Sequence, residues 1–425
     1  MSEGATTLAE APLEESRKPV KFKLTWQVLL LALGGLILLL SFTRAVTGAV
    51  DLTSAGAINA AVALAVPIGL AGLGGLWSER AGVVNIGLEG MMILGTWAGA
   101  WGAIHFANPW AGIVAGAIGG ALGGLLHAIA TVTFGVDHII SGVAINILGL
   151  GVTQFLSKVT FAEMPGGGDS QSPPVPKPGI VSLPWVGDPL ATLEAKQWFL
   201  LSDVAGILRG LTTNVSLFTL LAILLIPLTF YVLWRTAFGL RLRSCGERPV
   251  AAESLGVNVY YYKYVAVVVS GALAGLGGAF LSLVASSAYR EGQTGGRGFI
   301  GLAAMIFGNW RPGGLAAGAT LFGYTDALQL RRGGESVHAL LLMVAIMIAG
   351  VAVYQLVRQN RTRAALITGA AAIVVFVVFT LTDTIPPQFT SVTPHITTLL
   401  VLSLAAQRLR PPAADGVPYR RGQAK

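Results

Sequence analysis

Long apolar runs with hardly a charge in them alternate along the chain with shorter polar segments. Most of these runs exceed the roughly 18 residues that mark a helix able to cross a bilayer. The pattern therefore predicts an all-α polytopic membrane protein with about ten transmembrane helices, at residues 24–42, 56–76, 82–105, 109–131, 138–157, 214–234, 264–286, 337–355, 364–382 and 391–407.

One further apolar stretch, residues 298–328, is interrupted by Asn309, Arg311 and Pro312. Its first arm, up to Gly308, would rise only about 16 Å as a helix, against a hydrocarbon core of roughly 30 Å. We therefore expect a re-entrant hairpin of two short helices. With this hairpin, 18 of the 28 Lys and Arg residues lie inside, nine lie outside and one lies at the tip, whereas a full crossing would give 12 inside and 15 outside. The positive-inside rule favours the hairpin and two cytoplasmic termini.

Polar segments divide the chain into parts. We expect residues 1–23 to be a disordered cytoplasmic tail, 24–407 to be the transmembrane domain and 408–425 to be a second cytoplasmic tail. Within the domain, the segment 158–213 is too polar to cross a membrane and too long for a tight turn. It predicts an external cap, with a solvated linker as the alternative.

Composition narrows the possible functions. Hydrophobic residues make up 54% of the chain and charged residues 11%, against about 25% charged in an average soluble protein, so a soluble fold is excluded. The net charge of +8 is attributed to loops on the inner side. The sequence has no Gly-Lys pair, which excludes a P-loop, and neither HExxH nor GxSxG occurs. With a single cysteine, Cys245, and five scattered histidines, we expect no catalytic residues, no metal and no cofactor in this chain.

Glycines recur at helical contact spacing. Small residues four apart let helices approach closely in lipid, where no hydrophobic force draws helices together. We expect these faces to pack within one subunit, with a dimer face as the alternative. They are Gly112, Gly116, Gly120 and Gly124 on one helix, and the pairs Gly95 and Gly99, Gly271 and Gly275, and Gly314 and Gly318.

The most charged loop between spans on the inner side, residues 238–258, reads FGLRLRSCGERPVAAESLGVN. Gly246 is expected to make a turn, Pro249 suits the first turn of a helix and Gly256 suits the position after its end. These start and stop signals predict a short helix of about seven residues, Pro249 to Leu255. Such a helix suits contact with a soluble motor, and the alternative is an ordinary positive-inside loop.

A second segment places ionisable and amide side chains at membrane depth. Glu79 and Arg80 are expected at the inner interface, whereas Asn85 and Glu89 are four apart and are predicted to share one helix face. Polar groups are costly at membrane depth, so each of them is a candidate for a functional role. They either line a solute path or accept hydrogen bonds from neighbouring backbone, and Asp326 is a similar but isolated case.

Four ordered motifs resemble a known family, the permease subunits of bacterial ABC importers of the simple-sugar, nucleoside and branched-chain amino acid type. The signature of its nucleoside-type branch is similar to LGGLWSERAGVVNIGLEGMMILG, and its coupling loop is similar to FGLRLRSCGERPVAAESLGVNV. Its later motifs resemble GGRGFIGLAAMIFGNWRPGG through FGYTDALQLR, and its last span and short Pro-Tyr tail resemble TPHITTLLVLSLAAQRLRPPAADGVPYRRG.

The resemblance implies a type II ABC importer-like permease, a transport subunit rather than an enzyme, in a bacterial cell membrane. It implies three partners: a second related permease in a heterodimer, an ATPase with two fused cassettes that binds ATP and Mg, and an extracytoplasmic substrate-binding protein. No nucleic acid partner is expected. Nucleosides are the favoured cargo, and simple sugars come second.

Carried over residue by residue, the resemblance places the contact with the ATPase in the predicted short helix and its flanks. The residues are Gly246, Glu247, Arg248, Pro249, Ala251, Ala252, Leu255 and Gly256. To these we add three candidates for the translocation path, chosen on their predicted depth: Asn85, Glu89 and Asp326.

Two departures from the family pattern stand out. Residues 336–390 look like an insertion of two extra spans, and Arg248 stands where an asparagine is usual. The alternative function, of a different class, is a stand-alone secondary transporter or channel for a small polar solute. It would need an acidic ion site near the bilayer midplane, for which Asp326 is the best candidate.

Overall fold

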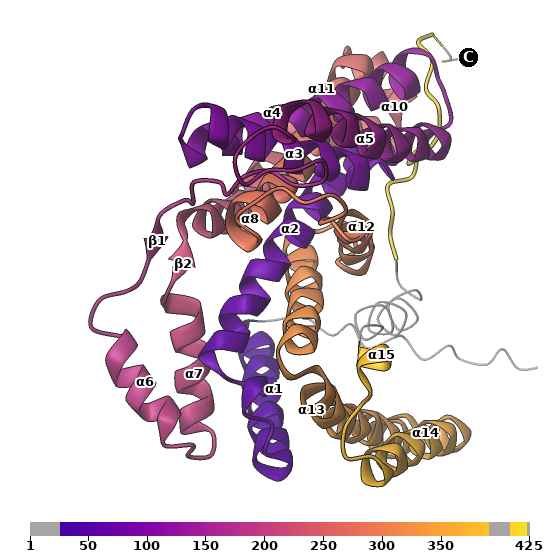
Figure 1. Cartoon of the computed structure of the whole chain (residues 1–425). Coiled ribbons are helices and arrows are strands. Elements are labelled where there is room, and N and C mark those ends of the chain that lie inside the picture. Colours follow the sequence, from indigo (N-terminus) through magenta and orange to yellow (C-terminus); the bar gives the residue numbers. More distant parts are fainter. Residues whose placement is uncertain (1–25, 391–408, 423–425) are drawn as a thin grey trace, which may run out of the picture.

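The computed structural model describes residues 26–390 and 409–422, and Figure 1 shows that this part of the chain is built mainly of helices. Two short strands, β1 (Ile180–Val181) and β2 (Val215–Ser216), pair antiparallel. The helices are α1 (Trp26–Thr47), η1 (Val50–Leu52), α2 (Ala55–Arg80), α3 (Leu88–His105), α4 (Pro109–Ala128), η2 (Ile129–Thr133), α5 (His138–Phe161), α6 (Gly187–Ala195), α7 (Leu201–Thr212), α8 (Leu217–Arg235), α9 (Ala237–Glu247), α10 (Pro249–Ser254), α11 (Val259–Phe280), η3 (Leu281–Ala285), α12 (Arg297–Phe307), α13 (Pro312–Gln359), α14 (Thr362–Leu381) and α15 (Pro387–Thr390).

The all-α polytopic fold is confirmed, but the count of ten spans is not. In the described part of the chain, eight helical segments are long and apolar enough to cross a membrane: α1, α2, α4 with η2, α5, α8, α11 with η3, α13 and α14. The span expected at 82–105 is shortened, because residues 81–87 form turns and an irregular link before α3 begins. The span expected at 391–407 lies outside the described residues, as does the tail at 1–23.

The hairpin expected at 298–328 is wrong in its second arm. The first arm, α12, has 11 residues and is short, as expected. The second arm belongs to α13, which continues to Gln359 and leaves helical geometry at Arg332. The stretch of α13 before that break would rise about 30 Å, the thickness of a hydrocarbon core. Pro312 starts this helix, and the turn 308–311 interrupts the stretch where Asn309, Arg311 and Pro312 predicted a break.

Helix α2 links two opposite ends of the described structure. Its 26 residues correspond to about 39 Å of helix, and it packs against α7, α11, α12 and α13. At its first residue, the Ala55 amide donates to Glu194 of α6 (2.8 Å). At its last turn it meets α9, which in turn packs against α10. We call these the α7 end and the α10 end.

The predicted glycine faces pack backbone against backbone within the subunit. A Cβ added at Gly275 would lie 2.3 Å from the carbonyl oxygen of Gly116, and one added at Gly271 would lie 2.3 Å from that of Gly120. Such distances leave no room for any side chain. Helices α4 and α11 are therefore held at the closest approach that two helices can make.

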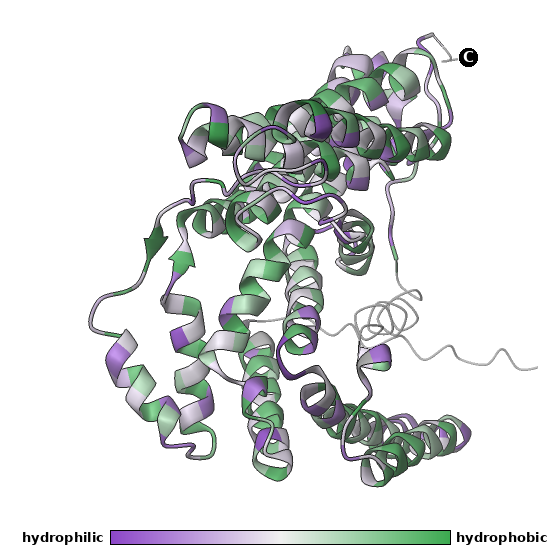
Figure 2. Ribbon diagram, viewed as in Figure 1, coloured by the Kyte–Doolittle hydropathy of each residue, from purple (hydrophilic) through white to green (hydrophobic). Residues whose placement is uncertain are grey.

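Apolar residues cover the outer faces of the helices as well as the interior (Figure 2). On α5, the side chains of Ile140, Ile147 and Phe155 are each about two-thirds exposed. An outward face of this kind is costly in water and suits contact with lipid.

Two regions add structure to what the sequence only outlined. The segment 158–213 holds β1, α6 and α7, so it is a folded cap in place of a plain linker, and α6 and α7 lie side by side (Figure 1). In the region 336–390, the later part of α13 packs against α14. The two helices expected there are present.

Candidate coupling element and solute cavity

The short helix predicted between spans is present as α10. It begins with Pro249 at its first position and is six residues long, one fewer than expected. Gly256 has φ +80°, and its amide donates to the carbonyl of Glu253 (2.8 Å), while the amide of Val257 donates to that of Ala252 (3.0 Å). These bonds close the end of the helix in the left-handed conformation that glycine adopts without strain. The backbone of α10 is thus fixed at both ends.

Gly246 does not make the expected turn. It lies in the last turn of α9, a helix that the sequence analysis did not foresee. A Cβ on Gly246 would lie 2.3 Å from the carbonyl oxygen of Arg80. This glycine therefore allows α9 to lie directly against the end of α2.

The residues assigned to a motor contact differ in their accessibility. Glu247, Arg248, Ala251 and Leu255 are exposed, and Leu255 has 86% of its surface free. Ala252 is only 3% exposed, so its assignment to a partner-facing surface is corrected. It packs inside this chain, and a large residue there would disturb α10 itself.

The last turn of α2 is bonded to the turn 308–311 and to α9. The indole Nε1 of Trp310 donates to the buried carboxylate of Glu79 (2.6 Å). The guanidinium of Arg80 donates to the carbonyl of Trp310 (2.7 Å) and lies 3.8 Å from Glu247. It also lies over the ring of Trp234. These contacts would therefore transmit a displacement of α9 directly to α2.

A buried lysine, Lys263 on α11, lies beside this junction. Its side chain is 3% exposed and donates to the carbonyl of Gly82 (3.3 Å). Asp415, from the C-terminal segment, interacts with Lys263 and Glu79, and burial raises the pKa of Asp415 to about 6. Sequence reasoning missed Lys263, although a cation inside the apolar run YYYKYVAVVV is a signal of the kind that membrane depth makes informative.

The three residues proposed for a path are bonded within the protein. Asn85 lies before α3 and not on it, so the prediction that it shares a helix face with Glu89 is wrong. Its amide donates to the hydroxyl of Ser270 (2.9 Å). Glu89 accepts from the amides of Gly296 and Gly298 (2.9 and 2.7 Å) at the start of α12, where a negative charge is favoured.

Asp326 forms an ion pair with Arg297 (2.7 Å), which ties α13 to the start of α12. A cavity lies at the α7 end, between α2, α8, η3 and the cap. Asp326, like Asn85 and Glu89, does not line it. Contacts inside the chain thus account for the buried Asn85 and Glu89 and for the partly buried Asp326.

At the α7 end, a partly open cavity of about 310 Å³ lies between three of the membrane-spanning helices and the cap. Thr219 of α8 is 4% exposed and lines it, and its hydroxyl has no hydrogen-bond partner among the described residues. The π-helical turn η3 forms one wall, and such turns are frequent at functional sites. The lining residues are Asn59, Val62, Ala63, Lys177, Pro178, Ile180, Asn214, Val215, Ser216, Thr219, Leu283, Val284 and Ala285.

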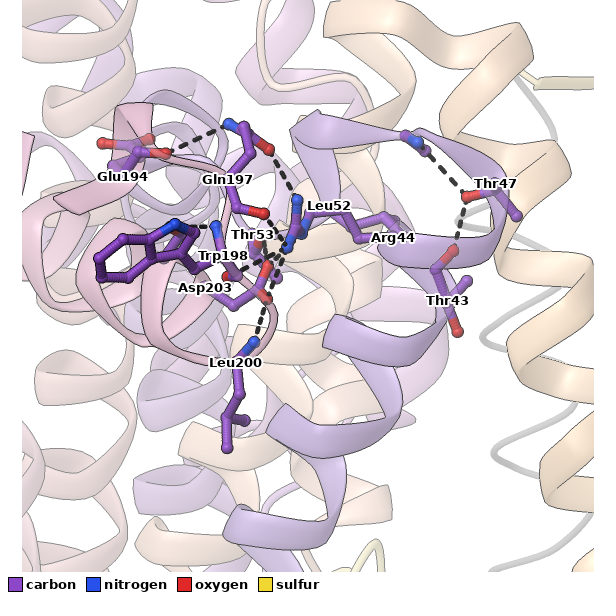
Figure 3. A network of polar contacts seen from close by, with 12 residues as sticks. Thr43, Arg44, Thr47, Leu52, Thr53, Glu194, Gln197, Trp198, Leu200 and Asp203 are labelled. Carbon is purple, nitrogen blue, oxygen red and sulfur yellow. Dashed lines mark hydrogen bonds and ion pairs between the residues drawn. The ribbon is translucent and has the colours of Figure 1, made fainter.

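A buried ion pair fixes the cap beside this cavity (Figure 3). Arg44 at the end of α1 contacts Asp203 of α7 (2.6 Å), and the two side chains are 8% and 1% exposed. Asp203 also accepts from the hydroxyl of Thr53 and the amide of Leu200, and Arg44 donates to Gln197 (2.6 Å). The cap is therefore attached to α1 and to the start of α2.

The family described as "Branched-chain amino acid transport system / permease component" matches residues 57–352 of the chain. The chain belongs to this permease family. No solved structure matches it.

Three relatives cover most of this permease. The guanosine ABC transporter permease protein NupQ of Bacillus subtilis is 32% identical over 373 residues, 86% of this chain and 97% of the relative. The nucleoside ABC transporter permease protein NupC of Lactococcus lactis is 34% identical over 362 residues, 83% of this chain and 93% of the relative. The putative glucose ABC transporter permease protein TsgC13 of Haloferax volcanii is 35% identical over 278 residues, which are 65% of this chain and 78% of the relative. The protein is thus a multi-pass permease subunit of an ABC importer.

Proposed function

We propose that this permease receives mechanical work from a separate ATPase through α10. The observation that supports this is the geometry of α10, a short helix with both ends fixed that leaves Leu255 86% exposed. Covering such a side chain gains about 1.5–3 kcal/mol, which a partner pocket would supply. ATP and Mg bind to the ATPase in this scheme, since the chain itself has no P-loop.

The mechanism that follows is alternating access. Closure of the ATPase displaces α10, and α9 moves with it because they pack together. The displacement reaches α2 through the backbone contact of Gly246 with Arg80. Because α2 extends to the cavity at the α7 end, a tilt of this helix changes both ends together.

Nucleosides are the proposed cargo. Two relatives that cover most of the chain are named for guanosine or nucleoside transport, and the cavity offers hydroxyl and amide groups, such as those of Thr219 and Asn59, among apolar walls. Lys177 is the one charged residue of the lining, and the rest of the wall suits a solute with a polar sugar and a flat base. Simple sugars come second, because a third relative is named for glucose.

The proposed orientation places the α10 end and both termini in the cytoplasm of a bacterial cell and the α7 end outside. A substrate-binding protein then docks over the cap and the cavity, and a second, related permease completes the path as a heterodimer. Arg248, which stands where the family has asparagine, is exposed beside α10 and would face the ATPase.

The decisive experiment changes Leu255 in the intact transporter, purified with its partner chains and placed in vesicles. Leu255→Asp puts a charge into the proposed pocket and should lower solute uptake per ATP at least tenfold, whereas Leu255→Met keeps the apolar contact and should have little effect. Equal uptake by the Asp variant would remove α10 from the coupling role.

A second measurement separates the rival function. A stand-alone secondary transporter would accumulate solute on a proton or sodium gradient without any ATPase. Its best ion-site candidate, Asp326, is already paired with Arg297. We expect vesicles containing this permease alone to show no uphill uptake, and accumulation there would favour the rival.

A further inference from the structure

The C-terminal segment 409–422, which we call the strap, crosses the α10 end without forming a helix or strand. Figure 1 shows it running along the end of the molecule near α10. An irregular terminal segment is ordered only where its backbone groups and side chains find partners. The partners of the strap belong to the elements that coupling would have to move.

The strap is bonded to α9 at the contact between α9 and α2. The amide of Ala414 donates to the carbonyl of Gly246 (2.9 Å), and the amide of Ala413 donates to the carboxylate of Glu247 (3.2 Å). The carbonyl oxygen of Ala414 is also close to Gly82, just beyond α2. One turn of the strap therefore joins α9 to the end of α2.

Further along, the strap meets α10 itself. Arg421 pairs with Glu253 (3.6 Å), and the amide of Gly422 approaches the same carboxylate (3.4 Å). Between these contacts and Ala414, the ring of Tyr419 is 9% exposed and packs against Tyr260 at the start of α11 (5.6 Å between centroids). The strap thus connects α10 with α11 as well.

Its first residues contact the turn between α12 and α13. The amide of Arg410 donates to the side-chain oxygen of Asn309 (2.9 Å). This turn includes Trp310, which bonds Glu79 and Arg80 at the end of α2. The strap is therefore one covalent segment that touches α10, α9, α11 and the turn 308–311.

We propose that the strap is part of the coupling surface, which the ATPase contacts together with α10, and that it carries the displacement of α10 to α2 and to the turn 308–311. This inference rests on the proposed function. Arg420 and Arg421 are exposed beside α10, and Arg248 is exposed at its start. With the exposed Glu247, these three arginines leave an excess of positive charge beside Leu255, and such a surface fits an ATPase pocket with an acidic rim.

The first test asks whether the ATPase touches the strap. A photo-reactive amino acid is placed at position 420 in the intact transporter, with position 255 as the positive control and Val181 in β1, at the other end, as the negative control. We expect positions 420 and 255 to cross-link to the ATPase and position 181 not to do so. Cross-linking at 255 without any at 420 would overturn the contact.

The second test asks whether the strap transmits movement. Ala414→Pro removes the amide that donates to Gly246, whereas Ala414→Ser keeps it. We expect Ala414→Pro to lower solute uptake per ATP about fivefold or more in an assembled transporter that still hydrolyses ATP, and Ala414→Ser to behave as the unmodified protein. Removing only residues 423–425 should have no effect.

The outcomes separate this inference from the proposed function. If Leu255→Asp uncouples transport and Ala414→Pro does not, α10 acts alone and the strap has no part in coupling. If neither variant uncouples transport, the proposed role of α10 fails as well. Should Ala414→Pro prevent assembly, Tyr419→Ala, which loosens the strap only at α11, replaces it and must lower uptake per ATP for the inference to stand.

Discussion

The two ends of the permease are built on opposite principles. At the α10 end, Glu79, Lys263, Trp310 and the strap are joined in one bonded group. At the α7 end, a cavity of about 310 Å³ is lined by Thr219, whose hydroxyl has no partner among the described residues. The cap is held beside it by an ion-pair cluster and by packing of α7 against α2. The first arrangement resists deformation and suits transmission of movement, while the second leaves space and hydrogen-bonding capacity for a solute.

The largest expected effect concerns the cap. Asp203→Ala leaves Arg44 buried without its partner, and breaking a buried pair in this way costs about 3–5 kcal/mol. We expect the cap to loosen at α1 and the thermal unfolding temperature of the purified permease to fall. The double variant Arg44→Met with Asp203→Leu restores apolar packing and should recover much of the loss. A single variant as stable as the original would show that the ion pair does not hold the cap.

The cavity provides the next test. Thr219→Trp fills the space beside η3 and should lower uptake more than tenfold, or about 1.4 kcal/mol in the transport barrier, while basal ATP hydrolysis persists. Thr219→Val keeps the shape, removes the hydroxyl and should have a smaller effect. Uptake by the Trp variant at the original rate would place the path elsewhere.

At the α10 end, docking of the strap should depend on pH. The pKa of Asp415 is raised to about 6, so the docked state binds the proton more tightly than the free strap, whose carboxyl has an ordinary pKa near 3.9. The stabilisation is complete below the free value and is lost as pH rises through 6. The charged groups that face Asp415 are Glu79 and Arg80 of α2 and Lys263 of α11.

Between pH 5 and pH 7.5, this shift corresponds to about a tenfold weaker docking equilibrium. Hydrogen exchange of the strap amides, corrected for the intrinsic pH dependence of exchange, measures it. Asp415→Asn cannot titrate and should remove the difference. Stronger protection at pH 7.5 than at pH 5 would reverse the sign and contradict the assignment.

The smallest effect distinguishes two glycines only ten residues apart. Gly256 has φ +80° and no atom within 4 Å of an added Cβ, so Gly256→Ala should cost about 1 kcal/mol of backbone strain. Gly246→Ala should cost more, because its Cβ meets the carbonyl of Arg80 at 2.3 Å. Thermal unfolding of the two variants compares them. Equal losses would mean that α9 can move away from α2 without penalty.

Local signals predicted the parts of the molecule that depend on local chemistry. Pro249 and Gly256 mark the ends of α10 because their backbone preferences act within the helix itself. Apolar run length predicted most spans for the same reason. Asn309, Arg311 and Pro312 predicted the turn of the hairpin, but the length of its second arm was not predicted, because α13 continues beyond residue 328 without a local stop signal.

The candidate site was harder to predict because it depends on distant segments. Ala252 looks accessible in a charged loop, yet it is buried in the structure, where α10 packs against α9 and α11. Asn85 and Glu89 are correctly spaced for one helix, but α3 begins between them. Thr219 could not be found at all, because its cavity is formed by α2, α8, η3 and the cap together.

The glycine contact between α4 and α11 has a consequence for how the permease changes shape. At Gly116, Gly120, Gly271 and Gly275 there are no side chains that could adopt other rotamers, so this interface has no alternative arrangement to switch into. We therefore expect the two helices to move together as one rigid unit during transport. Conformational change then has to occur at interfaces where side chains interdigitate. A disulfide that links α4 to α11 should leave transport intact.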